Sequence, residues 1–129
     1  MKRVSCWALA ASLYLGVLGM STGAPAQNPE PSVSIAFVGD IMLDEGPGKV
    51  IKNGRDPFAP MAAILNGADI RVGNLECVIA TKGTPEPDKP YTFRAHPRTL
   101  KVLKRHFDAL ALANNHSGDY GPVAFGEML

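Results

Sequence analysis

The sequence predicts an α/β domain, because three short apolar runs typical of strands alternate with two stretches that have helical spacing. The order is strand, helix, strand, long loop, helix, strand, without internal repeats. Each apolar run ends in glycine or polar residues, and the ligands of open α/β sheets bind at such carboxyl ends. We therefore expect a functional site where the strands end. The expected strands are residues 33–38, 68–73 and 109–113.

The first 26 residues are expected to be a signal peptide that is cleaved after Ala26. Lys2 and Arg3 form a basic start, residues 4–20 are uncharged, and residues 24–26 supply the small side chains of a cleavage site. An uncleaved membrane anchor is the alternative, because the uncharged run approaches the ~20 residues that a spanning helix needs. With cleavage, the mature protein is exported, periplasmic or extracellular, and has no stable membrane span. A flexible leader is then expected at residues 27–32, and the domain at 33–129.

The charge balance gives no reason to expect nucleic acid or an anionic membrane as a partner. The whole chain has 13 basic and 12 acidic residues, and loss of Lys2 and Arg3 leaves 11 against 12, a net charge of −1. Cys77 is the one cysteine that remains after cleavage, so it can form no internal disulfide. We expect it to be a small buried residue and not a nucleophile.

The first expected strand, residues 33–38, is uncharged and rich in β-branched and aromatic residues, which is typical of a central strand. Gly39 allows a sharp turn at its end, and Asp40 follows. The carboxylate of Asp40 is either a metal ligand or general base, or a helix N-cap or turn residue. Residues 41–48 are expected to lead away as a loop.

Two helices are expected between the strands. Asp56 and Pro57 open the first as N-cap and first helical residue, and residues 66–67 (Asn-Gly) close it. The second occupies residues 97–106, with apolar and basic side chains on opposite faces. Residues 81–90 are rich in turn formers and predict a surface excursion.

The stretch 107–121 (FDALALANNHSGDYG) changes from apolar to polar residues at Asn114. Its apolar run, residues 109–113, has no charge and no helical period, which fits a strand buried on both faces of a sheet. The polar residues that follow can bind a metal or polarise an oxyanion, since they include amides and an imidazole. The alternative is a turn made by residues that favour such positions. The polar residues are Asn114, Asn115, His116, Ser117 and Asp119.

The second expected strand is also followed by polar residues, Asn74 and Glu76. Three strand ends thus deliver carboxylate, amide and imidazole groups, and convergence of such groups is how a catalytic metal site is assembled. A divalent metal ion of open identity is therefore the expected cofactor. Its candidate ligands are Asp40, Asn74, Glu76 and Asn115.

Three segments of the chain resemble the CapA family, the poly-γ-glutamate capsule synthesis proteins. They are VGDIML, ADIRVGNLE and KPYTFRAHPRTLKVLKRHFDALALANNHSGDYG, and together they cover nearly all of the chain from residue 33 onwards. The specific part is N-N-H-x-x-D-x-G after a strand, preceded by Y-x-F-R-A. The resemblance implies a fold similar to calcineurin-like metallophosphoesterases, an αββα sandwich of two mixed sheets. It also implies an anionic polymer or small-molecule substrate and cell-envelope biosynthesis proteins as partners.

The resemblance also assigns roles to single residues. Asp40 matches the aspartate of the first metal motif, whereas Met42 stands where that motif has a histidine. Asn74 replaces the bridging aspartate of the second motif, and Ser117 replaces the acid after the Asn-His pair. His116 is the expected catalytic residue, as general acid or as electrostatic stabiliser. Arg94 and Asn114 are expected to bind substrate, and Gly39, Asp119 and Gly121 to support the site.

Three functions stay open on this basis: a capsule or surface-polymer biosynthesis protein, a metal-dependent hydrolase of phosphoesters or polymer amides, and a non-catalytic secreted binding module. A further helix is expected to begin after Gly121 and the sequence ends at Leu129. We therefore expect residues 33–129 to be the N-terminal part of a larger domain, with the family's later histidine motifs beyond it.

Overall fold

A computed structural model describes residues 30–129 of the chain. The expected signal peptide and the first part of the leader lie outside the described residues. Residues 31–129 form one unit that contains two small sheets and several short helices.

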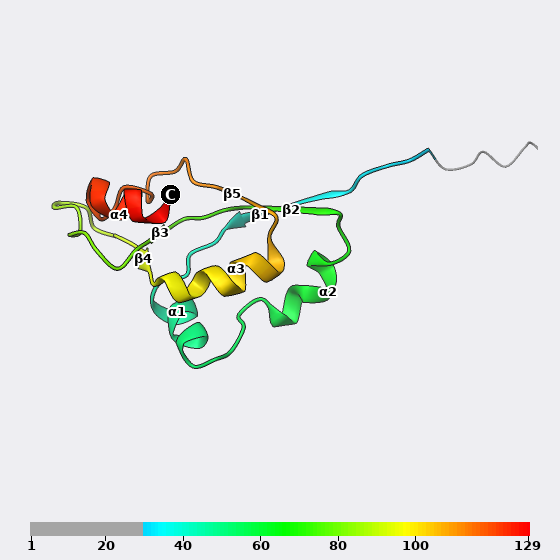
Figure 1. Cartoon of the computed structure of the whole chain (residues 1–129), viewed down its shortest axis with the longest axis horizontal. Helices are drawn as coiled ribbons and strands as arrows, with labels where there is room; N and C mark the ends of the chain where they lie inside the picture. Colours follow the sequence, from blue (N-terminus) through cyan, green and yellow to red (C-terminus); the bar gives the residue numbers. More distant parts are fainter. Residues whose placement is uncertain (1–29) are drawn as a thin grey trace, which may run out of the picture. The chain divides into compact units, whose positions relative to one another are not determined.

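The larger sheet contains all three strands that the sequence predicts. It consists of β1 (Ile35–Asp40), β2 (Ile70–Asn74) and β5 (Ala109–Ala111), all parallel and in the order β1-β2-β5. Figure 1 shows the three strands side by side. The α/β class is therefore confirmed. A register shift late in β1 leaves Asp40 opposite Asn74, so the ends of these two strands meet.

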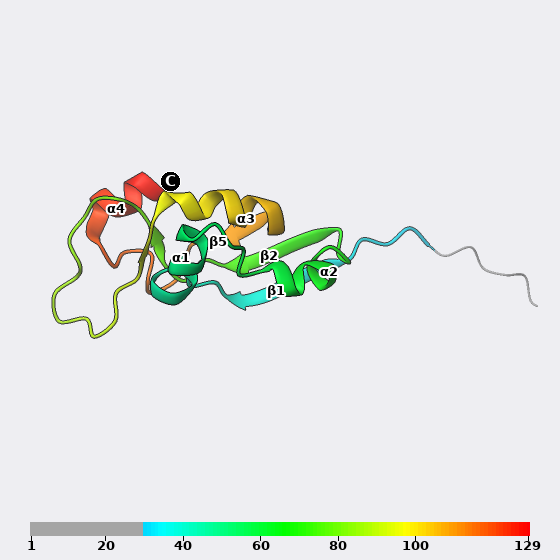
Figure 2. The same ribbon diagram turned by 90° about the horizontal axis from the view of Figure 1, so that it is seen from below.

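Helices α1 (Glu45–Lys52), α2 (Ala62–Leu65) and α3 (Leu100–His106) lie on one side of this sheet (Figures 1 and 2). Two 3₁₀ turns precede the latter two: η1 (Ala59–Met61) before α2 and η2 (Pro97–Thr99) before α3. The helix expected at residues 97–106 is thus confirmed as η2 plus α3. The last helix, α4 (Gly121–Met128), follows the turn after β5, and its first residue, Gly121, has a φ of +76° that favours glycine.

Two predictions about helices are wrong. The expected loop at 41–48 in fact contains the start of α1, where the Asp44 carboxylate accepts the Glu45 N–H at 2.8 Å. Its glycines and proline suggest a loop, but proline is tolerated in the first turn of a helix. The helix that opens at Asp56 is broken into η1 and α2, because Pro60 has no N–H to donate within it.

The core lies between the helices and the sheet. It consists of buried side chains from the segments after β1 and β2 and from the helices, among them Leu43, Leu75 and Leu103. Cys77 is fully buried and free, as expected, and burial raises the pKa of its thiol to about 11. At neutral pH it is therefore a protonated core residue.

The opposite face of the sheet is uncovered within residues 30–129. Ile35 is 50% exposed and Phe37 is 76% exposed, and Ala109 and Ala111 are exposed too. The predictions of a central first strand and of a strand at 109–113 buried on both faces are therefore wrong for the described residues. β1 lies at the edge of the sheet, because apolar composition does not specify how many layers cover a strand.

The smaller sheet pairs β3 (Val78–Ile79) with β4 (Arg94–Ala95) in parallel. The chain between them makes the expected surface excursion, since residues 81–88 are all exposed. Both sheets are parallel over the described residues, and the αββα sandwich implied by the resemblance stays a prediction.

Candidate functional site

The candidate site lies where β1, β2 and β5 end, and its centre is the side chain of Asn74. The Nδ2 atom of Asn74 donates to Oδ1 of Asp40 at 2.9 Å and to Oε2 of Glu76 at 2.6 Å. One neutral amide thus joins two carboxylates. Its hydrogens stabilise the negative charges and offset the repulsion between them.

Asn114 fixes the orientation of this amide. Its Oδ1 accepts the backbone N–H of His116 at 3.0 Å, and a backbone N–H can only donate, so the oxygen must face it. Its Nδ2 therefore points the other way and donates to Oδ1 of Asn74 and to the carbonyl oxygen of Leu75, each at 2.9 Å. Because the oxygen of Asn74 is thereby occupied by a donor, its nitrogen faces the carboxylates of Asp40 and Glu76.

His116 lies between two carboxylates. Its Nδ1 is 2.7 Å from Oδ2 of Asp119, and its Nε2 is 3.9 Å from Oε1 of Glu76. The ring of Phe93 packs against the imidazole with 4.5 Å between ring centroids. The His116 side chain remains 12% exposed, so part of it is reachable from solvent.

Asp119 lies in hydrogen-bond contact with the His116 imidazole and is 1% exposed. Burial by itself raises the pKa of this carboxyl, but hydrogen bonds from Lys89, His116 and the Phe93 N–H outweigh burial and lower the pKa. Asp119 is therefore ionised at neutral pH and accepts a hydrogen from Nδ1 of His116. That leaves Nε2 as the imidazole nitrogen that faces Glu76.

Two predicted site residues are placed away from this cluster. The guanidinium of Arg94 donates to the carbonyl oxygens of Lys82 and Gly83 and lies 4.3 Å from the ring centroid of Tyr120. The side chain of Asn115 is exposed and makes no hydrogen bond within the described residues. Gly39 lies in the stretch of β1 where the register shifts.

Sequence reasoning missed Lys89 and Phe93. The Nζ of Lys89 contacts Oδ1 of Asp119 and the backbone oxygen of Asn115, and the Phe93 N–H donates to Asp119 at 2.6 Å. Both residues belong to the segment KPYTFRA, which carried part of the family resemblance. The sequence therefore marked this segment as part of the site, but the residue chosen from it as a site residue was Arg94.

The fit of a divalent metal to these residues is partial. Asp40 and Glu76 offer carboxylate oxygens, but Asn74 presents its nitrogen to them, and an amide nitrogen is not a metal ligand. Among residues 30–129, no three Asp, Glu, His or Cys side chains converge as a metal site requires. The sulfur of Met42 accepts the Asp44 N–H at 3.2 Å. The four-ligand set with Asn74 and Asn115 stays a prediction.

Comparison with known proteins identifies the family. No helix in the described part of the chain has the length and hydropathy to cross a membrane. Among curated proteins, none matches the sequence. A family model described as "Bacterial capsule synthesis protein PGA_cap" matches residues 34–129, which include every residue of the cluster around Asn74 and His116. The chain therefore belongs to the bacterial capsule synthesis protein family PGA_cap, as its resemblance to CapA proteins indicates.

Proposed function

We propose that this protein is exported and acts in the cell envelope, where it processes an anionic capsule or surface polymer such as poly-γ-glutamate. Two observations support the proposal: membership of the capsule synthesis family and the signal-peptide pattern in residues 1–26. The fold alone would not select this function, since one fold hosts many activities. The chemistry must come from the site.

The observation that carries the chemical part is the position of His116 between Asp119 and Glu76. An imidazole that donates Nδ1–H to a buried carboxylate keeps Nε2 available for proton transfer, and Asp119 acts as its positioning residue. The separation of 3.9 Å between Nε2 and Oε1 of Glu76 leaves this edge without a direct hydrogen bond. A water or a substrate group can bind there.

The proposed reaction is hydrolysis of an amide bond in the polymer. The oxygen of a water held by His116 and Glu76 bonds to the carbonyl carbon, while one water proton moves to Nε2 of His116. As the C–N bond breaks, the leaving nitrogen takes that proton. The products are a carboxylic acid and an amine, and His116 returns to its neutral form.

Metal-dependent phosphoester hydrolysis is the second candidate, favoured by the two carboxylates that Asn74 joins. Asp40 and Glu76 would hold a divalent ion, which would supply Lewis-acid activation of the phosphoryl oxygen. The amide of Asn74 would have to turn its oxygen toward the ion, and Asn114 would have to release it. EDTA sensitivity separates this candidate from the first.

The test uses the purified protein with poly-γ-glutamate, and measures chain length by size-exclusion chromatography and new amino groups with an amine-reactive dye. We expect chain shortening that survives EDTA and falls by about 10²–10⁴-fold in His116→Gln. Lys104→Gln, an exposed substitution on α3, is the control.

Each other outcome points to a different function. Phosphoester cleavage that EDTA abolishes supports the metal-dependent candidate. Binding of the polymer without any cleavage supports a non-catalytic module. A deletion strain with unchanged surface polymer removes the biological role altogether.

A further inference from the structure

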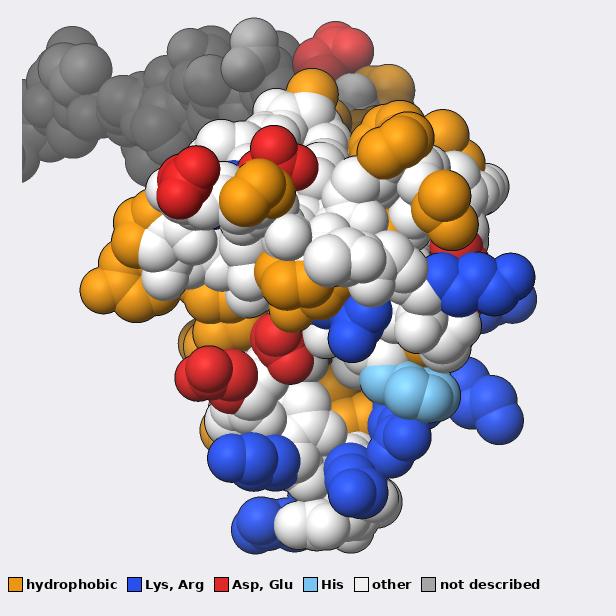
Figure 3. Space-filling model, turned by 90° about the vertical axis from the view of Figure 1, so that its left-hand side faces the viewer, with side chains coloured by type: hydrophobic (Ala, Val, Ile, Leu, Met, Phe, Trp, Pro, Cys, Tyr) orange, Lys and Arg blue, Asp and Glu red, His pale blue; other side chains and the backbone are white. Residues whose placement is uncertain are grey.

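A basic hollow lies between α1 and η2, outside the cluster around His116. It has a volume of about 240 Å³ and is lined by Lys49, Lys52, Arg94, His96 and Arg98, together with Asp44 and Glu45. Figure 3 shows Lys and Arg side chains gathered around a histidine on one face of the molecule. The hollow thus combines a concave shape with an excess of positive charge.

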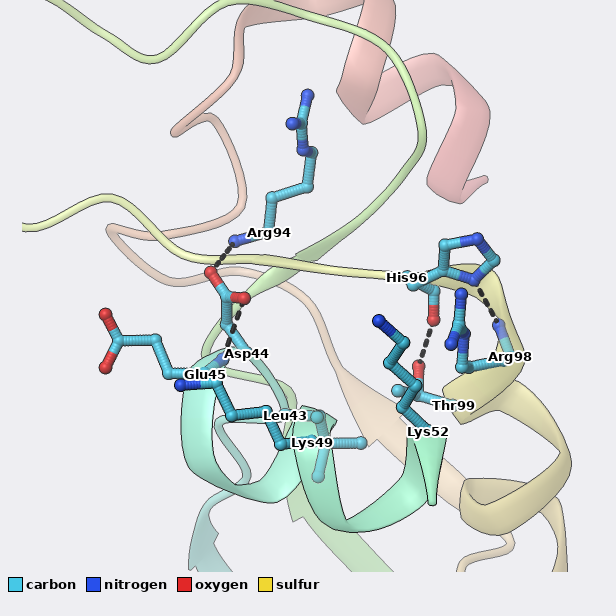
Figure 4. A pocket seen from close by; sticks show the side chains of 10 residues that line it. Leu43, Asp44, Glu45, Lys49, Lys52, Arg94, His96, Arg98 and Thr99 are labelled. Carbon is cyan, nitrogen blue, oxygen red and sulfur yellow. Dashed lines mark hydrogen bonds between the residues drawn. The ribbon is translucent and has the colours of Figure 1, made fainter. Parts of the chain in front are cut away.

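The acidic side chains at this hollow do not form ion pairs with Lys52 or Arg98. Asp44 is occupied as a cap, since its two oxygens accept the N–H groups of Glu45 at 2.8 Å and Arg94 at 2.9 Å. In Figure 4 the carboxylate of Glu45 lies on the far side from Lys52 and Arg98. Among residues 30–129, neither Lys52 nor Arg98 has a carboxylate within salt-bridge distance.

Three donors of the hollow lie together: Lys52, Arg98 and His96 (Figure 4). Nδ1 of His96 accepts the Arg98 N–H at 3.1 Å, so the neutral ring carries its hydrogen on Nε2. Lys52 and Arg98 repel each other while no anion lies between them. An anion bound here would remove that repulsion and use donors that have no other acceptor in the described part of the chain.

The shape of the hollow favours a chain over a compact ligand. A volume of about 240 Å³ is below the roughly 300–1,000 Å³ of sites for drug-sized molecules. A second hollow of about 310 Å³, lined by Ala80, Thr81, Arg94 and His96, shares two residues with the first. The two hollows therefore adjoin at Arg94 and His96, and together they are called the track below.

The donors favour carboxylates over phosphates or nucleic acid. Lys49 and Lys52 belong to the last turn of α1, where the helix dipole is negative and opposes a dianionic group. Neither hollow has a Phe, Tyr or Trp in its lining on which a base could stack. Spaced single charges on a flexible chain suit such a track best.

We propose that this track, from Lys52 and Arg98 across His96 to Thr81, binds an extended polycarboxylate chain. The strand that lines it also reaches the catalytic cluster, because Phe93 packs on His116 and Arg94 follows directly. The inference rests on the proposed function for the fate of the bound chain, but not for its binding.

Binding is tested with the full-length protein and fluorescently labelled polyglutamate by anisotropy, without turnover. We expect the double variant Lys52→Ala/Arg98→Ala to bind about tenfold more weakly at low salt. The double variant Lys101→Ala/Lys104→Ala removes the same charge from exposed positions on α3 and should change affinity less than about twofold. Equal weakening by both doubles, or by neither, overturns the proposal.

Two further arms identify the ligand and separate this inference from the proposed reaction. Free glutamate should not compete with the polymer at equal carboxylate concentration; equal competition would overturn the extended track. Polyphosphate that binds more tightly than polyglutamate, and depends on Lys52 and Arg98, would overturn the choice of carboxylates. A wild-type protein that cleaves nothing, but whose binding of polyglutamate depends on Lys52 and Arg98, would retain the binding track and contradict only the proposed hydrolysis.

Discussion

The side-chain amide of Asn114 sets the orientation of the side-chain amide of Asn74. The two are joined by a 2.9 Å hydrogen bond from Nδ2 of Asn114 to Oδ1 of Asn74, and the backbone of His116 anchors the first amide. As a result the cluster is directional: donors run from the turn after β5 through both amides to two carboxylates. Substitutions of Asn74 and Asn114 therefore test whether the two amides are oriented in this way.

Replacing Asn74 with aspartate should convert the cluster into a cation site. In Asn74→Asp the two bridging hydrogens are lost and a third carboxylate meets Asp40 and Glu76, so we expect a loss of about 1–3 kcal/mol of unfolding free energy in EDTA. A divalent ion should restore it, and should shift the melting temperature of the variant more than that of the wild type. Thermal unfolding with EDTA or Mn²⁺ measures both effects.

The exposed neighbour Asn115 supplies the control, because Asn115→Asp adds the same charge outside the hydrogen-bonded cluster. If the wild type responds to Mn²⁺ as strongly as Asn74→Asp does, the orientation of the Asn74 amide is not as described.

Adjacent asparagines should differ sharply in their effect on stability. Asn114→Ala leaves the His116 N–H and the oxygen of Asn74 without partners, and we expect a loss of about 1–3 kcal/mol. Asn115→Ala changes an exposed side chain and should stay within about 0.5 kcal/mol of the wild type. Urea denaturation of the two variants compares them directly, and similar midpoints would contradict the role given to Asn114.

Asp119 should contribute a stability that depends on pH. Its pKa is lowered in the folded protein, so its stabilising effect is present above the unfolded pKa of about 4 and is lost as the pH falls through the lowered value. Asp119→Asn should be less stable at pH 7 by about 3 kcal/mol, because Lys89 and His116 lose a buried partner.

The measurement is the unfolding free energy of wild type and Asp119→Asn between pH 7 and pH 3. Asp56 also has a lowered pKa and is affected in the same range, so the difference between the two proteins is the informative quantity. That difference should shrink below about pH 4. A difference that is constant with pH would mean that Asp119 acts by packing alone.

Export should produce a mature protein that begins at Gln27. Mass spectrometry of the protein from the envelope or the medium of an expressing bacterium reads the N-terminus directly. Ala26→Arg should block cleavage, because the site requires a small residue, and should leave a heavier precursor. A wild-type protein that keeps all 129 residues and sediments with membranes would favour the anchor instead.

Sequence reasoning located the strand ends well because apolar runs and the polar residues after them are local signals. β1, β2 and β5 lie within a few residues of their predicted bounds, and Asp40, Asn74, Glu76 and His116 are brought together. The roles within the cluster were out of reach, because the direction of an amide depends on partners 40 residues away. Lys89 was missed for the same reason.

The helices were predicted less well, because proline and glycine occur both in loops and near the starts of helices. Asp44 and Asp56 each have a proline within the next three residues, yet Asp44 caps a regular helix and Asp56 precedes a broken one. Composition alone does not separate these cases, because packing of Ile51 in the core supports α1. The same limit explains why an apolar β1 was expected at the centre of the sheet.

The uncovered face of the larger sheet exposes the hydrogen bonds around Asn74 to the high dielectric constant of water. Val72 pairs with Phe37 and Ala109, and Asn74 follows it by two residues, so Asn74 and Asp40 point to the same side as the exposed Phe37. In water, the high dielectric constant weakens the attraction between the Asn74 amide and its two carboxylates. Any apolar layer placed over Phe37 would lower that constant and tighten the cluster.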